Sequence, residues 1–327
     1  MSRRRSYIAW PALAMPLFLG SCEKSPVAPV KPDGARRDTL PRFAQVDYPL
    51  SWSTDGNLAA FRRCVPSSYG GPGLYVIPRF GGKPLYVLPA NIFWPKEVRF
   101  SPDGTRVAGV WNFSLFIADL RTGRVDWPYY TANGVGGVDW SPDGNTLLLS
   151  RRFYLPEQPE DSAGVHLFDV RTGRDEVFLS RGRHVYGGDP RWSPDGDSFA
   201  VVEYTDGAAR VAIYGLRDSS LKIVWPGTRA DDFENLQWVR PALFGHLKLA
   251  VRKYVGERQG SYLMDPDGSR LERLPYSIFF SALSPTRPEL LTLGWSGADS
   301  LGVVGVDWVS EDRVLWGRRL TAWRPPQ

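Results

Sequence analysis

A five-residue turn motif recurs along this chain, and it constrains the fold more than any other feature. Its clearest copy is Trp-Ser-Pro-Asp-Gly at 140–144, and the other copies are progressively less exact. The residues that begin the six copies are Trp52, Phe100, Trp140, Trp192, Trp238 and Leu283. They lie 48, 40, 52, 46 and 45 residues apart. A repeat of this length, built from short apolar runs, is typical of propeller blades.

The letters of the motif have a local physical meaning. An apolar strand ends at the aromatic anchor, and serine and proline then start a tight turn. The aspartate can accept hydrogen bonds from nearby backbone N–H groups, and the glycine can adopt a positive φ. An alternative is that the repeated aspartates bind metal, but each lies in its own turn without neighbouring ligands. We therefore interpret Asp55, Asp103, Asp143 and Asp195 as structural.

Each repeat contains four short apolar runs. The third run begins at Leu74, Leu115, Val165, Val211 and Tyr262 in the first five repeats, and the fourth often ends on a large apolar residue before proline. Proline is tolerated at the end of an outer edge strand, because no neighbouring strand there needs the backbone N–H that proline lacks. The pattern predicts an all-β fold, a six-bladed β-propeller of four-stranded antiparallel blades over 44–327. The irregular ends leave five or seven blades open.

The repeat is similar to a known family. Trp-Ser-Pro-Asp-Gly followed by an apolar strand, and Tyr-Leu-Met-Asp-Pro-Asp-Gly-Ser at 262–269, resemble the TolB-type propeller repeat over residues 44 to about 318. The resemblance implies the propeller fold and is weak for function, because such propellers also serve as accessory domains of peptidases and as sugar lyases. The segment before Trp52 is too short for the N-terminal domain of TolB, so TolB itself and the Tol–Pal system are not implied.

The N-terminus predicts export. Three arginines at 3–5 precede an apolar run at 7–20, which Pro11 and Pro16 interrupt. This is the pattern of a signal peptide, here residues 1–21. Leu-Gly-Ser-Cys at 19–22 resembles the bacterial lipobox, which implies that Cys22 is lipidated; an ordinary secretory signal with a chance cysteine is the alternative. Glu23 favours the outer membrane, and the Pro-rich residues 22–43 should form an extended tether to the cell envelope.

Composition adds modest limits. The formal net charge is +5, and three of the positive charges are the signal arginines, so there is no argument for nucleic acid as a partner. There are two cysteines. If Cys22 carries lipid, Cys64 has no intramolecular partner, and we interpret it as an unreactive thiol near a strand end.

The variable loops indicate where a binding site should lie. The Ser-Pro-Asp-Gly turns and the Thr-Gly turns fall at one side of the propeller, which we call the turn side. The opposite, loop side carries the connections between the second and third strands and between blades, and these differ in length. Varied loops on a rigid scaffold are where binding residues usually gather.

Two sets of residues are candidates on the loop side. The ends of the second strands carry Arg62, Arg63, Trp111, Arg151, Arg152, Glu203, Tyr204, Arg252, Lys253 and Trp295. The inner strands begin near Trp94, His184, Tyr186, Asp189, Asp232 and Glu234. A basic ring with aromatics suits an acidic protein partner or an anionic glycan. The alternative is ordinary solvated strand ends, with some arginines paired to the acidic segment at 157–161 or to Glu203.

Motifs for catalysis are weak in this sequence. Of three histidines, His166 takes a place filled by large apolar residues in other repeats, and no metal-ligand spacing is visible. We therefore assign no catalytic residue, metal or cofactor, although a pair made by Asp189 with Asp232 or Glu234 stays open. The sequence predicts a lipid-anchored binding or scaffolding module of the bacterial envelope, with an envelope protein or peptide as partner and membrane contact by the lipid alone. The alternative is an enzyme that acts on a carbohydrate or lactone in the central pocket.

Overall fold

The structure is a computed structural model that describes thirteen stretches of the chain. They are residues 46–64, 73–89, 95–129, 134–151, 164–180, 190–205, 208–239, 245–255, 257–274, 282–287, 289–293, 301–306 and 314–319. The chain divides into two units, Met1–Asp38 and Thr39–Gln327, and all described residues lie in the second. The predicted signal peptide, Cys22 and the whole predicted tether lie outside the described residues.

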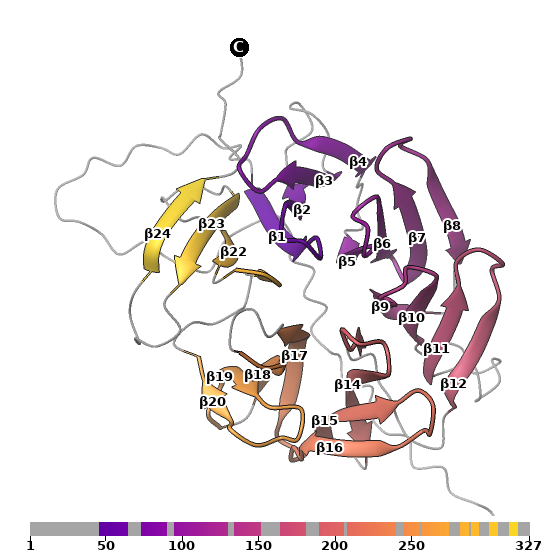
Figure 1. The fold of residues 1–327 in the computed structure, drawn as a ribbon, viewed down its shortest axis with the longest axis vertical. Helices are drawn as coiled ribbons and strands as arrows, with labels where there is room; N and C mark the ends of the chain where they lie inside the picture. The colour runs from indigo at the N-terminus through magenta and orange to yellow at the C-terminus, as the bar shows by residue number, and fades with distance from the viewer. Residues whose placement is uncertain are drawn as a thin grey trace, which may run out of the picture. The chain divides into compact units, whose positions relative to one another are not determined.

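The first three sheets follow the chain in order (Figure 1). The first sheet contains β1 (Val46–Trp52), β2 (Leu58–Cys64), β3 (Gly73–Pro78) and β4 (Leu85–Pro89). The second contains β5 (Pro95–Phe100), β6 (Arg106–Trp111), β7 (Ser114–Asp119) and β8 (Val125–Tyr129). The third contains β9 (Val135–Trp140), β10 (Thr146–Arg151), β11 (Gly164–Asp169) and β12 (Asp175–Ser180).

The remaining described strands repeat the same order. The fourth sheet contains β13 (Arg191–Trp192), β14 (Ser198–Thr205), β15 (Ala208–Gly215) and β16 (Leu221–Trp225). The fifth contains β17 (Asp232–Val239), β18 (Lys248–Val255), β19 (Gly260–Met264) and β20 (Glu272–Arg273). The sixth contains β21 (Ala282–Leu283), β22 (Glu289–Leu293), β23 (Leu301–Val306) and β24 (Val314–Arg319). Within each sheet, consecutive strands pair antiparallel.

This arrangement confirms the predicted all-β propeller of four-stranded antiparallel blades. The inner strands β1, β5, β9, β13 and β17 contact one another in sequence, and β21 contacts β1. The first five sheets are described with most of their side chains, whereas the sixth is described mainly by its backbone. The count of six blades is therefore part of the proposal below. In the described part of the chain, no helix is long and apolar enough to cross a bilayer.

The apolar core lies between neighbouring sheets rather than within them. Separate clusters fill the interfaces of sheets one and two, two and three, three and four, and four and five. A fifth cluster joins Phe61 and Ile77 of the first sheet to Leu291 of the sixth. Fully burying one such side chain contributes about 1.5 to 3 kcal/mol, so the sheets stabilise one another.

The repeated turns have the predicted chemistry. In the third sheet, the Ser141 hydroxyl donates to Asp143 at 2.5 Å and accepts from the Thr146 N–H at 2.9 Å. Asp143 also accepts from the Asn145 N–H at 3.0 Å. Gly144 has a φ of 73°, a conformation that strains any residue with a Cβ. The turns that begin at Ser53, Ser101 and Ser193 repeat the hydroxyl-to-aspartate bond, which confirms that their aspartates are structural.

Two of the tryptophan anchors, Trp140 and Trp238, also join neighbouring sheets, which the sequence did not predict. The indole N–H of Trp140 donates to the carbonyl oxygen of Arg99 at 3.1 Å. In the same way, Trp238 donates to the carbonyl oxygen of Arg191 at 3.0 Å. In both cases the acceptor belongs to the residue that precedes the anchor of the preceding sheet. The anchor therefore ends its own inner strand and ties that strand to the sheet before it.

The first and sixth sheets are joined by polar contacts. Arg79, directly after β3, forms an ion pair with Glu289 of β22. Arg287 donates to the carbonyl oxygen of Gly56 at 3.2 Å. The carboxylate that pairs with the Arg79 guanidinium is buried, since only 4% of the Glu289 side chain is exposed. These contacts connect the two ends of the described propeller.

Candidate functional site

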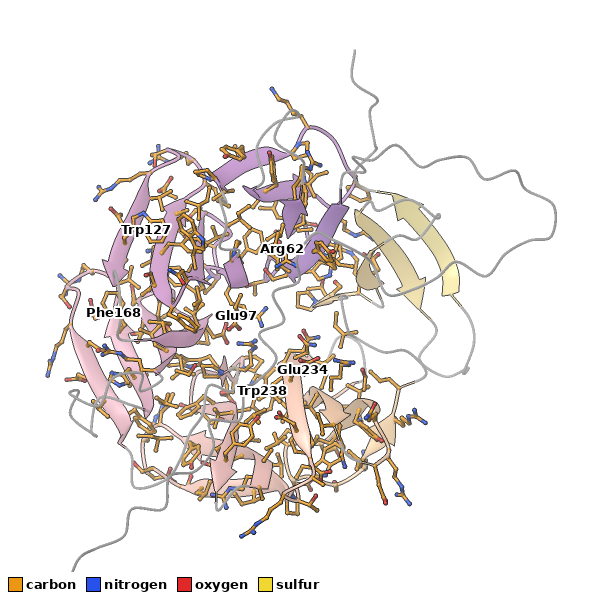
Figure 2. The ribbon with its side chains drawn as sticks, turned by 180° about the vertical axis from the view of Figure 1, so that it is seen from behind. Arg62, Glu97, Trp127, Phe168, Glu234 and Trp238 are labelled. Atoms are coloured by element: carbon orange, nitrogen blue, oxygen red, sulfur yellow. The ribbon has the colours of Figure 1, made fainter. Side chains whose placement is uncertain are left out.

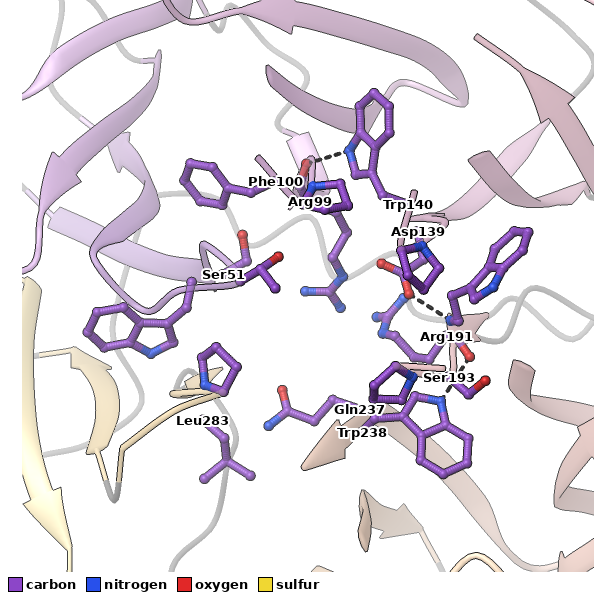
Figure 3. Close-up of a pocket in the computed structure, with 17 residues that line it drawn as sticks. Ser51, Arg99, Phe100, Asp139, Trp140, Arg191, Ser193, Gln237, Trp238 and Leu283 are labelled. Atoms are coloured by element: carbon purple, nitrogen blue, oxygen red, sulfur yellow. Dashed lines mark hydrogen bonds between the residues drawn. The ribbon is translucent and has the colours of Figure 1, made fainter. Parts of the chain in front are cut away.

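A central cavity opens at the turn side, where the inner strands end (Figure 3). Its volume is about 190 Å³. Residues of all six sheets line it, and many are the anchors and the residues directly before them. The residues before the anchors that line it are Ser51, Arg99, Asp139, Arg191 and Gln237. Because side chains alternate along a strand, anchors pack between sheets while their neighbours face the centre.

The side chains of Arg99, Gln237 and Ser51 point into the cavity (Figure 3). Arg99 enters from β5 of the second sheet, and Gln237 enters from β17 of the fifth on the opposite side. Ser51 approaches from β1. The centre of this propeller is therefore polar, although the surrounding prolines and indoles are apolar.

Glu97 of β5 organises the charges beside the cavity (Figure 2). Its carboxylate is 2.5 Å from the Arg191 guanidinium and 3.2 Å from that of Arg99. Arg191 also donates to the carbonyl oxygens of Leu236 at 2.7 Å and of Pro190 at 2.8 Å. One buried carboxylate thus connects the second, fourth and fifth sheets through Arg191. Such a network fixes the orientation of its members, because an unpaired buried charge is strongly unfavourable.

Asp139 is the second carboxyl group of the cavity. Its Oδ2 accepts a hydrogen bond from the Trp192 N–H at 2.7 Å, which joins the third and fourth sheets. Burial raises the pKa of Asp139, while the nearby charges of Arg191 and Arg99 act in the opposite direction. The net effect favours the protonated form more than in an exposed aspartate.

Among the described residues, none of the predicted candidates lines this cavity. The sequence contained a usable signal, which is the residue directly before each anchor. An inner strand is expected to be apolar, so Arg99, Asp139, Arg191 and Gln237 at this one repeat position stand out once the copies are aligned. The predicted site fell on the loops instead, because loops vary in length and this repeat position lies inside strands.

On the loop side, the structure places two of the predicted arginines against aromatic rings. The guanidinium of Arg62 lies 4.5 Å from the ring centroid of Tyr48, and that of Arg63 lies 4.8 Å from Tyr75. Trp111 packs against Trp127 with ring centroids 5.0 Å apart. These contacts hold the side chains in defined positions at the ends of their strands.

Other candidates are buried in ion pairs with partners that the sequence did not identify. Arg151 donates to Asp175 of β12 at 2.7 Å, and Asp175 also lies 3.1 Å from the Nδ1 atom of His166. Glu203 is fully buried and binds Arg210 and the Tyr214 hydroxyl. The structure therefore gives Arg151 and Glu203 internal contacts rather than a surface position, and it confirms that His166 is packed inside.

The fifth sheet and β14 of the fourth sheet hold the remaining described candidates. Arg252 forms an ion pair with Glu234, and the Tyr204 hydroxyl donates to Asp232. Lys253 lies 2.6 Å from the carboxylate of Asp231, and this contact helps to lower the pKa of Asp231 against the opposing effect of burial. Asp232 and Glu234, predicted in the loop that enters the inner strand, both lie on β17 itself, and each accepts a hydrogen bond from a neighbouring strand.

Six candidates lie outside the described residues, together with the acidic segment at 157–161. They are Trp94, Arg152, His184, Tyr186, Asp189 and Trp295. The hypothesis of a carboxylate pair that includes Asp189 stays a prediction for this reason. Within the described stretches, no group of three or more His, Cys, Asp or Glu is arranged to hold a metal. The side chain of Cys64 is likewise not described.

Comparisons with known proteins agree with this geometry at the level of the fold. The sequence matches no family model and no curated protein. The structure is similar to TolB from Acinetobacter baumannii, with a TM-score of 0.54 and 16% identity over 80% of this chain. The aligned part spans 60% of that TolB. A putative TolB from Agrobacterium tumefaciens matches with a TM-score of 0.52 and 16% identity, over 70% of this chain and 76% of that one.

Sugar-acting enzymes share the architecture as well. An oligogalacturonate lyase solved with manganese has a TM-score of 0.55 and 16% identity, over 82% of this chain and 77% of that chain. An oligogalacturonate lyase from Vibrio parahaemolyticus matches with the same TM-score and 13% identity, over 86% and 81% of the two chains. Identities this low carry the fold alone. The chain is similar in fold to the β-propellers of TolB proteins and oligogalacturonate lyases.

Proposed function

We propose that this chain is a protein-binding propeller that captures a partner at its loop side. In full, the proposal is a six-bladed ring, anchored in the bacterial envelope by lipid on Cys22, that binds an envelope protein or peptide. The outer membrane is the proposed location. The similarity to TolB structures agrees with a protein-binding propeller.

One observation carries the proposal. At the loop side, Arg62 and Arg63 lie over Tyr48 and Tyr75, and Trp111 packs against Trp127. Arginine, tyrosine and tryptophan are the residues that most often dominate protein interfaces. Side chains that are already ordered lose less conformational entropy when a partner binds. The arginines further favour a partner with acidic groups at the contact.

In-cell crosslinking of the tagged full-length chain, followed by mass spectrometry, should identify the partner. Binding of that purified partner is then compared between the native chain and the double variant Arg62→Ala/Arg63→Ala. We expect at least about a tenfold loss of affinity, because central arginines and aromatics carry most of the energy of an interface. Trp111→Ala should weaken binding to a similar degree.

The matched control is Arg121→Ala/Arg124→Ala. Both residues are exposed in the turn between β7 and β8, on the opposite side, and the control removes the same charge. It should bind like the native chain. Equal losses in both double variants would show that only net charge matters and would overturn the proposed face.

The lipid anchor is tested separately. Cys22→Ala should leave the protein unprocessed or in the soluble fraction, because the acylated residue is gone. Processed, membrane-bound protein from this variant contradicts the anchor without touching the binding proposal.

A second candidate function is action on, or binding of, an anionic carbohydrate. The similarity to oligogalacturonate lyases favours it. Incubation of the purified chain with oligogalacturonate, with and without added manganese, should release unsaturated products if this function holds. A protein partner lost in Arg62→Ala/Arg63→Ala, together with no product release, would decide for the protein-binding function.

A further inference from the structure

The central cavity at the turn side has no role in the proposed protein-binding function, which uses the opposite side. We propose that this cavity binds a carboxylate group, held by the guanidinium of Arg99 and the side-chain amide of Gln237. The two side chains enter the cavity from opposite sheets and point toward its centre (Figure 3). A planar guanidinium can donate two parallel hydrogen bonds to a carboxylate, and an amide NH₂ can add a third.

Arg99 suits this role better than Arg191, which lines the same cavity. Arg191 donates to two backbone carbonyl oxygens and to Glu97, and only 5% of its side chain is exposed. Its contacts fix three sheets together. Arg99 contacts Glu97 at the longer distance of 3.2 Å, and 21% of its side chain is exposed. Arg99 lines the cavity and is the more exposed of its two arginines, although its Nε atom is buried.

The charge around the cavity permits an anion. Two arginines, Arg99 and Arg191, face two carboxyl groups, Glu97 and Asp139. Glu97 lies closest to Arg191, which compensates much of its charge. Burial raises the pKa of Asp139, which reduces the negative charge that an anion would meet. Arg99, which lies farther from Glu97 than Arg191 does, supplies the positive charge that an anion would contact.

The size of the cavity restricts the ligand. A volume near 190 Å³ is smaller than the roughly 300 to 1,000 Å³ of pockets that take drug-sized ligands. A cavity of this volume has room for one carboxylate group on a short carbon chain. The walls around the arginine are apolar, made by the anchors and by Pro102, Pro142 and Pro194 of the turns. The fitting ligand is a short-chain carboxylate, supplied either as a free acid or as the C-terminal end of a peptide.

Titration calorimetry on the full-length chain tests this with three probes: succinate, acetyl-dialanine with a free carboxylate, and the same dipeptide as its amide. The intrinsic fluorescence of the cavity tryptophans gives a second readout. We expect saturable binding of at least one acid at or below about 10 mM, and none of the amide. Tighter binding of succinate would indicate a free acid as the ligand. Tighter binding of acetyl-dialanine would indicate the C-terminal end of a peptide.

Two variants locate the binding. Arg99→Gln should weaken binding at least about tenfold, and Gln237→Leu several-fold, because each removes a donor to the anion. The matched control Arg124→Gln removes an exposed arginine and should bind normally. If Arg99→Gln fails to fold, the binding measured with Gln237→Leu still tests the proposal. Equal binding of acid and amide, unchanged binding in the folded variants, or no saturable binding of either acid would overturn the proposal.

Discussion

Arg79 and Glu289 lie 210 residues apart in the sequence and form an ion pair that joins the first sheet to the sixth. The pair is largely shielded from water, since 12% of the Arg79 side chain and 4% of the Glu289 side chain are exposed. The hydrogen bond with Glu289 raises the pKa of Arg79 despite the opposing effect of burial. The ion pair is one of few described polar contacts across this interface, so its loss should lower the free energy of unfolding.

Glu289→Leu should lower the free energy of unfolding by about 3 kcal/mol, because it leaves a shielded guanidinium without its carboxylate. Denaturant unfolding measures the change. The control Glu176→Leu removes a carboxylate that pairs with Arg174 on the exposed surface, and it should cost less than about 1 kcal/mol. Similar losses in the two variants would show that the ion pair at the closing interface has no special weight.

Trp140→Phe should destabilise the protein by about 1 to 3 kcal/mol through the loss of the indole donor to the Arg99 carbonyl oxygen. Trp192→Phe is the matched control. The indole nitrogen of Trp192 is buried and has no hydrogen-bond partner among the described residues. Its replacement removes a similar volume of ring without breaking such a bond, so it should cost less. The order of the two unfolding free energies checks the role of the indole bond, and the reverse order contradicts it.

Ser141→Ala should raise the pKa of Asp143 toward its ordinary value. The Ser141 hydroxyl and the Asn145 N–H lower the pKa of this carboxyl in the folded protein. A lowered pKa in the folded state stabilises the protein above the unfolded pKa of about 3.9, and this contribution is lost as the pH falls through the folded value. We expect a loss near 0.5 to 1 kcal/mol at neutral pH, since the carboxyl is exposed, and a smaller loss at acid pH. NMR titration of the Asp143 carboxyl measures the pKa directly, and an unchanged value contradicts the turn chemistry.

Asp139→Asn should change how stability depends on pH. Because burial raises the pKa of Asp139, the folded chain holds this proton more tightly than the unfolded chain. Asp139 therefore reduces stability as the pH rises from about 3.9 through the raised folded value. Asparagine removes this loss and keeps an oxygen that can accept the Trp192 N–H. Unfolding free energies over this pH range should differ between the native chain and the variant, with the variant gaining toward neutral pH. Parallel curves would contradict the raised pKa.

The fold could be predicted because its signals are local. In each turn, the contacts that matter join residues within five positions, as the Ser141 hydroxyl does with Asp143 and Thr146. The apolar run Leu115–Ile117 could be predicted as part of a third strand from its own residues, and it lies in β7. A motif that carries its own hydrogen bonds can be recognised without knowledge of the rest of the chain.

The site could not be predicted in the same way, because its contacts cross between sheets. Trp140 and Arg99 are 41 residues apart, and Trp238 and Arg191 are 47 apart. Nothing near Arg191 in the sequence indicates that it binds Glu97. Likewise, Arg151 meets Asp175 only because β10, β11 and β12 pair in a particular register. The loop-side candidates outside the described residues stay predictions.

A closed ring has one joint that the peptide chain does not cross, and here it lies between β1 and β21–β22. Every other pair of neighbouring sheets is consecutive in the sequence, so covalent linkage keeps them close even when their packing loosens. Closing a loop of some 210 residues has an entropic cost of about 5 kcal/mol, which the contacts of Arg79, Arg287 and Leu291 must offset. Transient opening of the native ring should therefore begin at this joint, with amides of β1 and β22 exchanging with solvent before those of β9 and β10.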